Sequence, residues 1–341
     1  MEFTAETFFD QLISQRPALP VSRVLNGEMM IEEWRGKLRE QVLCGLGTMC
    51  FDSLLNICEL ERVPCEGYTR VKLRYTVEPG LMTPAYLLIP DGYQKGSAAV
   101  LAVHGHGYGV KDIVGLNPDG SVRIGAPGYE KDFALSLVKK GFLVLAPELM
   151  GFGELRLDED KQAPHPDTSS CRRLSTALLM YGRTMAGIRV EQCVRALDLL
   201  ETVETVDKTR IGCMGISGGG LVCTFLAALD ERISAAVISG YANSFQASIF
   251  TFDHCVDNYL PGLALDAELE DILSLVAPRP MLWESGMFDP MFPVEAAKEA
   301  AETVRQVYRL KGMESLFEHD VFEADHQISG ARSFDFLREH L

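Results

Sequence analysis

The sequence lacks the features that would assign it to a membrane, secreted or repetitive class of protein. Residues 1–10 carry three acidic and no basic residues, so the positive segment and apolar core of a secretory signal are not present. The longest apolar runs, such as residues 98–103, are far too short to cross a bilayer. No internal repeat, low-complexity tract or Pro/Gly/Ser-rich linker divides the chain. We therefore expect an ordinary globular protein in the cytoplasm.

Paired cysteines and an excess of basic charge are also missing. The nine cysteines include no C-x-x-C pair, and Cys193, Cys213 and Cys223 fall inside apolar runs. Cysteines placed in this way predict reduced, buried thiols and neither a disulfide framework nor a zinc site. The chain has 32 Lys and Arg against 48 Asp and Glu, a formal net charge of -16. A surface this acidic repels phosphate groups. Neither nucleic acid nor a membrane is therefore expected as a partner.

Short runs of apolar residues alternate with amphipathic stretches through most of the chain. Runs that are apolar on both faces are typical of parallel strands covered by helices on both sides. The pattern predicts an α/β protein with a mostly parallel, doubly wound sheet, preceded by two antiparallel strands at residues 68–77 and 82–89. The parallel strands are expected at residues 98–103, 142–146, 211–214, 235–238, 281–283 and 315–322.

Three segments do not follow this alternation. Residues 1–62 have a helical pattern, in which Ile31, Trp34, Leu38 and Val42 recur at three- and four-residue spacing. We expect a helical N-terminal extension, followed by a catalytic domain at residues 63–341. Insertions near residues 155–181 and 241–271 lie between a strand and the next element, where lids over ligand sites often form.

A glycine-rich turn at residues 215–220 carries the clearest functional motif. Ser217 is the serine of Gly-Ile-Ser-Gly-Gly, which follows an apolar strand and precedes a helix of small residues. In a G-x-S-x-G turn the glycines let strand and helix approach closely, and the serine hydroxyl stands above the sheet edge. No G-x-x-x-x-G-K-[ST] phosphate loop is present. The motif predicts a nucleophilic serine in an α/β-hydrolase fold.

A serine nucleophile needs a histidine base and a carboxylate that orients it, and this fold places them in the order Ser, acid, His. Asp289 lies in the loop after the strand at residues 281–283, where it could also act as a turn cap. His326 follows the last expected strand. Among the other histidines, His254 is the main competitor, and His319 is expected at the surface. A protonated base cannot act, so activity should fall on acidification.

The second oxyanion donor is expected in the loop at residues 104–107, His-Gly-His-Gly, which follows the first parallel strand. We assign the backbone N–H groups of Gly218 and His106 to the oxyanion hole. His104 and His106 could in principle bind zinc. No carboxylate or cysteine accompanies them at ligand spacing, so neither a metal nor another cofactor is predicted.

On these residues the chain resembles α/β hydrolases similar to dienelactone hydrolase and bacterial acetyl xylan esterases. The resemblance covers about Tyr68 to the C-terminus. It rests on residues 78–80, 84–90, 104–107, 146–148, 151–154, 215–219 and 277–280. The family's nucleophile, acid and base fall on Ser217, Asp289 and His326. Dienelactone hydrolase uses a cysteine nucleophile, so a serine favours the esterase branch. The helical extension lies outside this resemblance and is expected to form a cap or a homo-oligomer contact.

Together these features predict a serine esterase that cleaves a carboxylic ester through an acyl-enzyme. Five aromatic residues of the second insertion could stack on a sugar ring of a carbohydrate ester, or could simply pack the lid: Tyr241, Phe245, Phe250, Phe252 and Tyr259. A short-chain acyl group is the other substrate considered. A peptidase, a thioesterase and a catalytically silent binding protein of the same fold remain alternatives.

Overall fold

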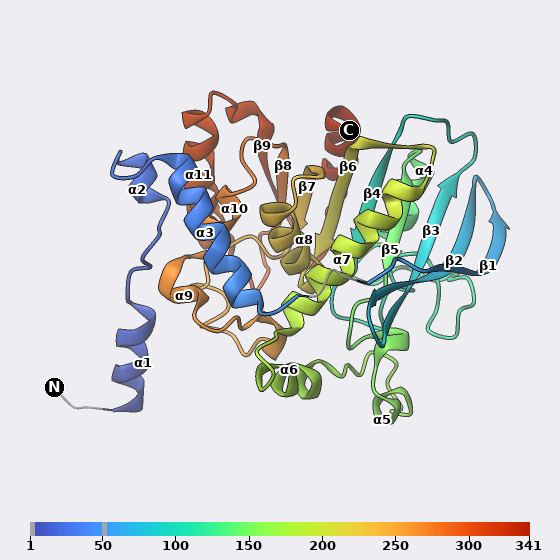
Figure 1. The fold of residues 1–341 in the computed structure, drawn as a ribbon, viewed down its shortest axis with the longest axis horizontal. Coiled ribbons are helices and arrows are strands. Elements are labelled where there is room, and N and C mark those ends of the chain that lie inside the picture. The colour runs from blue at the N-terminus through green and yellow to red at the C-terminus, as the bar shows by residue number, and fades with distance from the viewer. Residues whose placement is uncertain (1–3, 50–52) are drawn as a thin grey trace.

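A nine-stranded sheet forms the centre of the computed structural model, which describes residues 4–49 and 53–341 (Figure 1). The strand order is β1-β2-β3-β5-β4-β6-β7-β8-β9. Strands β5, β4, β6, β7, β8 and β9 pair in parallel, and β1, β2 and β3 pair antiparallel at one edge. The predicted doubly wound sheet with leading antiparallel strands is therefore confirmed. The strands are β1 (Ile57–Cys65), β2 (Tyr68–Glu78), β3 (Leu81–Pro90), β4 (Ser97–Val103), β5 (Leu143–Pro147), β6 (Val206–Ile216), β7 (Ile233–Ser239), β8 (Met281–Gly286) and β9 (Phe317–Phe322).

Helices cover both faces of the sheet, because its central strands are apolar on both sides. One face packs against α4 and α12, and the other packs against α7, α8 and α11, with α3 and α10 packed against those helices. All five residues of β5 are buried, which explains why its sequence is a continuous apolar run. The helices are α1 (Ala5–Ile13), α2 (Ser22–Leu25), α3 (Ile31–Leu46), α4 (Phe133–Lys139), α5 (Asp158–Lys161), α6 (Cys171–Leu179), α7 (Met185–Thr202), α8 (Gly218–Leu229), α9 (Leu263–Asp266), α10 (Leu269–Ser274), α11 (Val294–Leu310) and α12 (Ser333–His340).

The N-terminal extension is helical only in part. The apolar face of α3 is buried through Trp34, Leu38 and Val42, as its spacing predicts. The expectation of a helix up to residue 62 is wrong, because β1 begins at Ile57 and extends the antiparallel edge of the sheet. Most of β1 is exposed, so its sequence carries little of the alternation that marks a half-buried strand. Helix α1 buries none of its residues, and the homo-oligomer contact expected of these helices stays a prediction.

Both expected insertions lie at the end of the sheet where the parallel strands finish, and both carry short helices. The first contains α5 and α6, and the second contains α9 and the 3-10 turn η2 (Val256–Asn258) (Figure 1). Ligands of doubly wound sheets bind beyond the carboxyl ends of the strands. The insertions are thus in position to form the walls of a site there.

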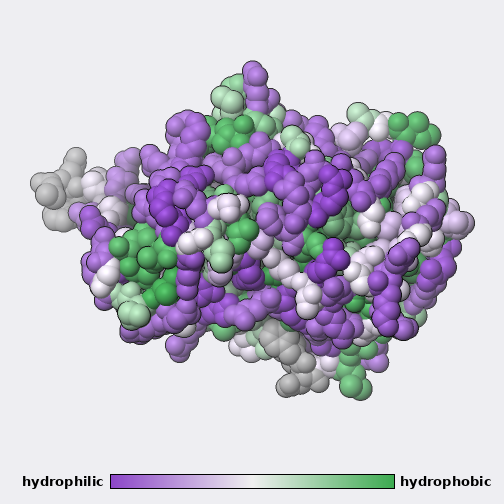
Figure 2. Space-filling model, turned by 90° about the horizontal axis from the view of Figure 1, so that it is seen from above, coloured by the Kyte–Doolittle hydropathy of each residue, from purple (hydrophilic) through white to green (hydrophobic). Residues whose placement is uncertain are grey.

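The visible surface in Figure 2 is largely hydrophilic, with separate hydrophobic patches. Over residues 4–49 and 53–341, no helix combines the length and the apolar character that spanning a bilayer demands.

Candidate active site

Ser217 stands at a sharp turn between β6 and α8, with backbone angles of φ 56° and ψ -121°. A non-glycine residue rarely adopts a positive φ, and such strain gathers at functional sites. The flanking glycines make the turn possible. A Cβ on Gly215 would lie 2.5 Å from the carbonyl oxygen of Gly219, and one on Gly219 would lie 2.0 Å from that of Val103. Helix and strand therefore meet here with no room for side chains.

His326 and Asp289 form a hydrogen-bonded pair beside this turn. The Nδ1 atom of His326 lies 2.6 Å from Oδ2 of Asp289. The other carboxylate oxygen of Asp289 accepts the backbone N–H groups of Met291 and Phe292 at 2.9 and 3.1 Å. Asp289 thus caps its own turn with one oxygen and holds the imidazole with the other, so both roles considered from the sequence are present.

The loops that carry this pair are locked together. The N–H groups of Met287 and Phe288 donate to the carbonyl oxygens of Phe322 and Ala324. A Cβ on Gly286 would lie 2.2 Å from the carbonyl oxygen of Asp325. The acid loop after β8 and the histidine loop after β9 are therefore in direct backbone contact.

The buried carboxylate of Glu284 is hydrogen-bonded to the loop that carries His326. Glu284 accepts the Ser239 hydroxyl at 2.6 Å and the backbone N–H of Gly330 at 3.0 Å. Burial raises the pKa of Glu284, and the Ser239 hydrogen bond acts against this rise. The orientation of His326 thus depends on contacts from β7, β8 and its own loop.

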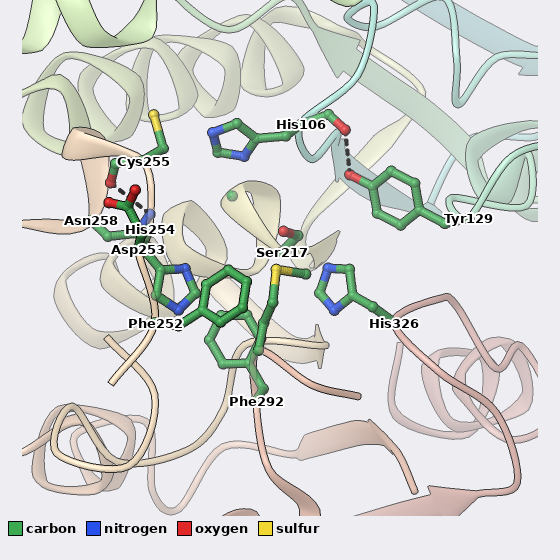
Figure 3. Close-up of a pocket in the computed structure, with 12 residues that line it drawn as sticks. His106, Tyr129, Ser217, Phe252, Asp253, His254, Cys255, Asn258, Phe292 and His326 are labelled. Carbon is green, nitrogen blue, oxygen red and sulfur yellow. Dashed lines mark hydrogen bonds between the residues drawn. The ribbon is translucent and has the colours of Figure 1, made fainter. Parts of the chain in front are cut away.

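Ser217 and His326 line one cavity of about 270 Å³, together with His106, Tyr129 and Phe252 (Figure 3). The Nε2 atom of His326 is buried and has no hydrogen-bond partner among the described residues. No hydrogen bond to the Ser217 hydroxyl is formed in this conformation. Catalytic hydrogen bonds are often long before substrate binds, and the unpartnered nitrogen is available to accept a proton.

The loop after β4 reaches the other side of Ser217. A Cβ on Gly105 would lie 3.3 Å from the Cβ of Ser217, so His106 and Ser217 belong to neighbouring walls of the cavity. Gly218 is the first residue of α8. Neither its N–H nor that of His106 donates a hydrogen bond to any residue in the described ranges. The two donors assigned to the oxyanion hole are both free for a ligand.

Two residues that the sequence did not single out hold this loop. The Tyr129 hydroxyl donates to the carbonyl oxygen of His106 at 2.7 Å (Figure 3), and its ring stacks on His326 with centroids 5.5 Å apart. The neighbouring Glu130, fully buried, accepts the backbone N–H of Gly105 at 3.1 Å. Burial raises the pKa of Glu130 well above its usual range. No local motif marks either residue, and only the Gly-Ala-Pro-Gly turn before them signals a structured loop.

The other candidate histidines differ from His326 in their partners. His104 is fully buried, and its Nε2 accepts the backbone N–H of Leu149 at 3.0 Å while Nδ1 faces the carbonyl of Gly105. Nε2 also lies 3.3 Å from the buried carboxylate of Glu148, so both ring nitrogens of His104 are occupied by structural contacts. His254 lines the same cavity, but burial lowers its pKa, and its Nε2 has no hydrogen-bond partner among the described residues.

The expectation that His319 lies at the surface is wrong. Its Nε2 lies 3.0 Å from the Ser285 hydroxyl, and its ring packs edge-on against Trp283. Burial lowers the pKa of His319 to about 4. The surrounding acidic residues in the sequence suggested exposure, but β9 turns this side chain toward β8.

The sequence shows no carboxylate or cysteine at ligand spacing from His106, but the fold brings three such residues to its side chain. Cys171, Cys255 and Asp257 lie against its imidazole, although they are 65 to 151 residues away in the chain. Burial opposes the charged form of His106, yet the adjacent Asp257 carboxylate outweighs it and raises the pKa of His106 to about 9. Arg189, fully buried, contacts both Asp257 and Cys171.

The aromatic residues of the second insertion mostly pack the protein. Tyr241 and Phe245 are buried, whereas Phe252 lines the cavity and is 43% exposed. Phe292, from the acid loop, lies on the same wall and stacks on His326 with centroids 5.8 Å apart. Of the five aromatic residues, Phe252 therefore lines the site, and the acid loop contributes a second ring, that of Phe292.

Comparison with known proteins agrees with this architecture. A sequence model of the Abhydrolase family matches residues 11–312. The match includes α3, so most of the N-terminal extension belongs to the family's common region. A Bacillus subtilis (strain 168) protein provisionally named a hydrolase, YtaP, is 28% identical over 236 residues, covering 67% of this chain and 73% of that protein. The resemblance to α/β hydrolases is confirmed.

Solved structures share the fold at low sequence identity. A protein of Bacteroides fragilis NCTC 9343, provisionally described as an acetyl xylan esterase, superposes with a TM-score of 0.79 at 18% identity, covering 95% of this chain and 83% of that chain. A glucuronoyl esterase from Solibacter usitatus superposes with a TM-score of 0.66 at 14% identity, covering 91% and 93%. At such identities the likeness establishes the fold.

Proposed function

Since the chain belongs to the Abhydrolase family, we propose that it is a serine esterase that cleaves a carboxylic ester through Ser217, His326 and Asp289. One observation carries this proposal above the others. His326 is held by Asp289 through Nδ1 at 2.6 Å, and its unpartnered Nε2 lies at the cavity that Ser217 lines from a strained turn. A base oriented in this way beside a serine is the arrangement that nucleophilic acyl transfer requires.

The proposed reaction proceeds through an acyl-enzyme. His326 takes the proton of the Ser217 hydroxyl as its oxygen attacks the ester carbonyl, and then gives the proton to the departing alcohol. Water hydrolyses the acyl group by the same route in reverse. The Asp289 carboxylate stabilises the imidazolium formed in each step. The free N–H groups of Gly218 and His106 are available to the oxyanion, and such donors contribute about 3–4 kcal/mol each.

We further propose a short acyl group, such as acetyl, on a carbohydrate alcohol. The cavity of about 270 Å³ is at the small end of ligand pockets. Phe252 and Phe292 offer rings on one wall for a sugar face. Similar structures include proteins described as an acetyl xylan esterase and a glucuronoyl esterase, both of which act on carbohydrate esters by name.

The test combines a covalent label with a substrate panel. A fluorophosphonate probe should label Ser217, and Ser217→Ala should abolish labelling and lower p-nitrophenyl acetate hydrolysis by more than about 10³-fold. Ser234→Ala is the matched control, because Ser234 lies at the start of β7, at the opposite end of the strand from the site, and its hydroxyl donates to the carbonyl oxygen of Thr209 on β6. Full activity in Ser217→Ala would contradict the proposal.

The panel distinguishes the alternatives on the same scaffold. Acetylated xylo-oligosaccharides and p-nitrophenyl acetate should be hydrolysed faster than the octanoate ester, an acyl thioester or a peptide anilide. Preference for the anilide would indicate a peptidase, and preference for the thioester a thioesterase. A chain that takes the fluorophosphonate probe nowhere and hydrolyses none of these compounds would be a silent binding protein.

A further inference from the structure

A second cluster of chemically active side chains lies next to the cavity, on the side of His106 away from His326. One ligand atom from each of His106, Cys171, Cys255 and Asp257 can be chosen so that all four lie within 4.8 Å of one another. Cys171 and Asp257 are buried, and the other two are half-buried. In Figure 3 the Cys255 sulfur points to the region beside the His106 ring. None of the steps proposed for ester hydrolysis uses these side chains beyond the backbone of His106.

The four residues come from three separate segments. His106 belongs to the loop after β4, Cys171 begins α6 in the first insertion, and Cys255 and Asp257 flank the start of η2 in the second. His106 and residues 252–255 and 258 of the second insertion form part of the cavity wall around Ser217, whereas no described residue of the first insertion is among those that line the cavity. A ligand bound by all four side chains would hold both insertions against the loop after β4, which carries the oxyanion donor of His106.

The orientation of the His106 ring shows that the cluster is more than a salt bridge. Its Nε2 atom is buried and lies 3.1 Å from Oδ2 of Asp257, yet no aligned hydrogen bond joins them. A histidine that served only to neutralise Asp257 would direct this N–H at the carboxylate oxygen. The nitrogen is instead left without a hydrogen-bond partner among the described residues.

We propose that His106, Cys171, Cys255 and Asp257 bind one zinc-type divalent cation in a closed tetrahedral site. Thiolate, imidazole and carboxylate are the ligands that zinc takes in proteins. Metal–ligand lengths of about 2.0–2.3 Å place the ligand atoms of such a tetrahedron roughly 3.3–3.8 Å apart. Atoms already within 4.8 Å therefore need only small side-chain movements to reach the cation.

Arg189 makes the filled site electrically neutral. Its guanidinium donates to Oδ2 of Asp257 at 2.5 Å and to Sγ of Cys171 at 2.8 Å, and it is fully buried. Two thiolates and a carboxylate carry three negative charges, which the divalent cation and Arg189 balance, with a neutral His106. A buried net charge would be costly. Both of its acceptors keep lone pairs for the metal, so Arg189 acts as an outer partner that orients the ligands.

Four protein ligands leave no open position for water or substrate, so this would be a structural site. Zinc binds thiolates and a neutral imidazole, so binding releases to solvent the thiol protons and the second ring proton of His106, and it ties the two insertions to the loop after β4. The inference is independent of the proposed esterase activity, because it concerns side-chain donors that take no part in acyl transfer.

The experiment measures metal content and cobalt spectra of the full-length protein, purified under reducing conditions without chelators. We expect about one equivalent of zinc per chain. Cobalt(II) added to the metal-free protein should give thiolate-to-cobalt charge-transfer absorption and the intense visible bands of tetrahedral coordination. Cys255→Ser should weaken cobalt binding by more than about 100-fold, as loss of a ligand exceeds the usual effect of outer partners.

The matched control is Cys58→Ser, which replaces an exposed thiol on β1 and should leave metal content and spectra unchanged. Cys255 is half-buried, so its replacement by serine is tolerated better than changes at Cys171 or Asp257. Circular dichroism of each variant checks the fold. Zinc should raise the melting temperature of the wild type and of Cys58→Ser, but not of Cys255→Ser.

Three results would overturn the proposal. The first is less than about 0.1 equivalent of metal after incubation with zinc, together with no cobalt charge-transfer band. The second is equal cobalt binding by the wild type and Cys255→Ser. The third is a Cys171–Cys255 disulfide in the protein as purified, detected as a loss of two hydrogens in the mass of the joined peptides. Esterase activity is not part of any of these readouts.

Discussion

Oδ2 of Asp289 lies 2.6 Å from Nδ1 of His326, and its partner oxygen Oδ1 is already occupied by two backbone N–H groups of its own turn. The carboxylate cannot rotate without losing these turn contacts. Asp289 thus presents one fixed acceptor to the imidazole. This selects the tautomer with hydrogen on Nδ1 and leaves the lone pair of Nε2 toward the cavity.

Replacing Asp289 by Asn should keep the turn but reverse the tautomer. The amide oxygen can still accept from Met291 and Phe292, so the NH₂ group would face Nδ1 of His326. The imidazole would then carry its hydrogen on Nε2 and could not take the serine proton. We expect kcat for p-nitrophenyl acetate to fall by about 10³–10⁴-fold, with a smaller change in KM.

Asp325→Asn is the control for this variant, because Asp325 is the exposed carboxylate that precedes His326 in the chain. It should change kcat by less than about twofold, as surface charges contribute little. Equal losses in the two variants would mean that general electrostatics near His326 matters, and that the contact with Asp289 does not.

Tyr129→Phe tests whether the oxyanion loop is held by a single hydroxyl. The variant keeps the ring that stacks on His326 but loses the 2.7 Å hydrogen bond to the carbonyl of His106. Displacing the His106 N–H from the oxyanion should raise the activation barrier less than removing this donor would. We therefore expect kcat to fall about 10-fold with KM nearly unchanged.

Tyr93→Phe provides the comparison, because its hydroxyl also donates to a backbone carbonyl, that of Ser97 at 3.0 Å, at the opposite end of β4. Each variant should lose about 1 kcal/mol of unfolding free energy in urea. Only Tyr129→Phe should lose activity. If both variants lowered kcat alike, the effect would be one of stability, and Tyr129 would have no positioning role.

The sequence predicted the parts of this site that depend on local geometry. The strand, turn and helix around Ser217 could be identified because the glycines required there leave a short motif. Asp289 and His326 could be placed because the order of parallel strands brings their loops to one sheet edge. The periodicity of α3 was equally informative, since Trp34 and Leu38 are fully buried on one face.

What could not be predicted depends on contacts between distant segments. Tyr129 and Glu130 lie in an irregular loop and act only because the chain folds back onto residues 105 and 106. The cluster around His106 joins three segments, and no spacing rule relates Cys171 to Cys255 before the fold is known. Strand β1 was missed because an exposed edge strand needs no apolar alternation.

His319 leads to a prediction about stability that is separate from catalysis. Burial between Trp283 and Ser285 of β8, with Arg305 and Lys298 of α11 nearby, lowers its pKa to about 4 in the folded protein. An unfolded histidine has a pKa near 6.5. Between these values the unfolded chain binds more protons, so this residue stabilises the fold above about pH 6.5 and loses that contribution as pH falls toward 4.

His319→Gln should remove this pH dependence, because glutamine does not titrate and can keep a hydrogen bond to Ser285. Between pH 7 and pH 4.5, the wild type should lose about 2 kcal/mol more unfolding free energy than the variant, a figure that allows for partial exposure. Urea denaturation at the two pH values measures it. His165→Gln, at an exposed turn of the first insertion, should follow the wild type. If the unfolding free energies of the wild type and His319→Gln changed in parallel with pH, the prediction would be contradicted. The folded protein would then accept protonated His319 without loss of stability.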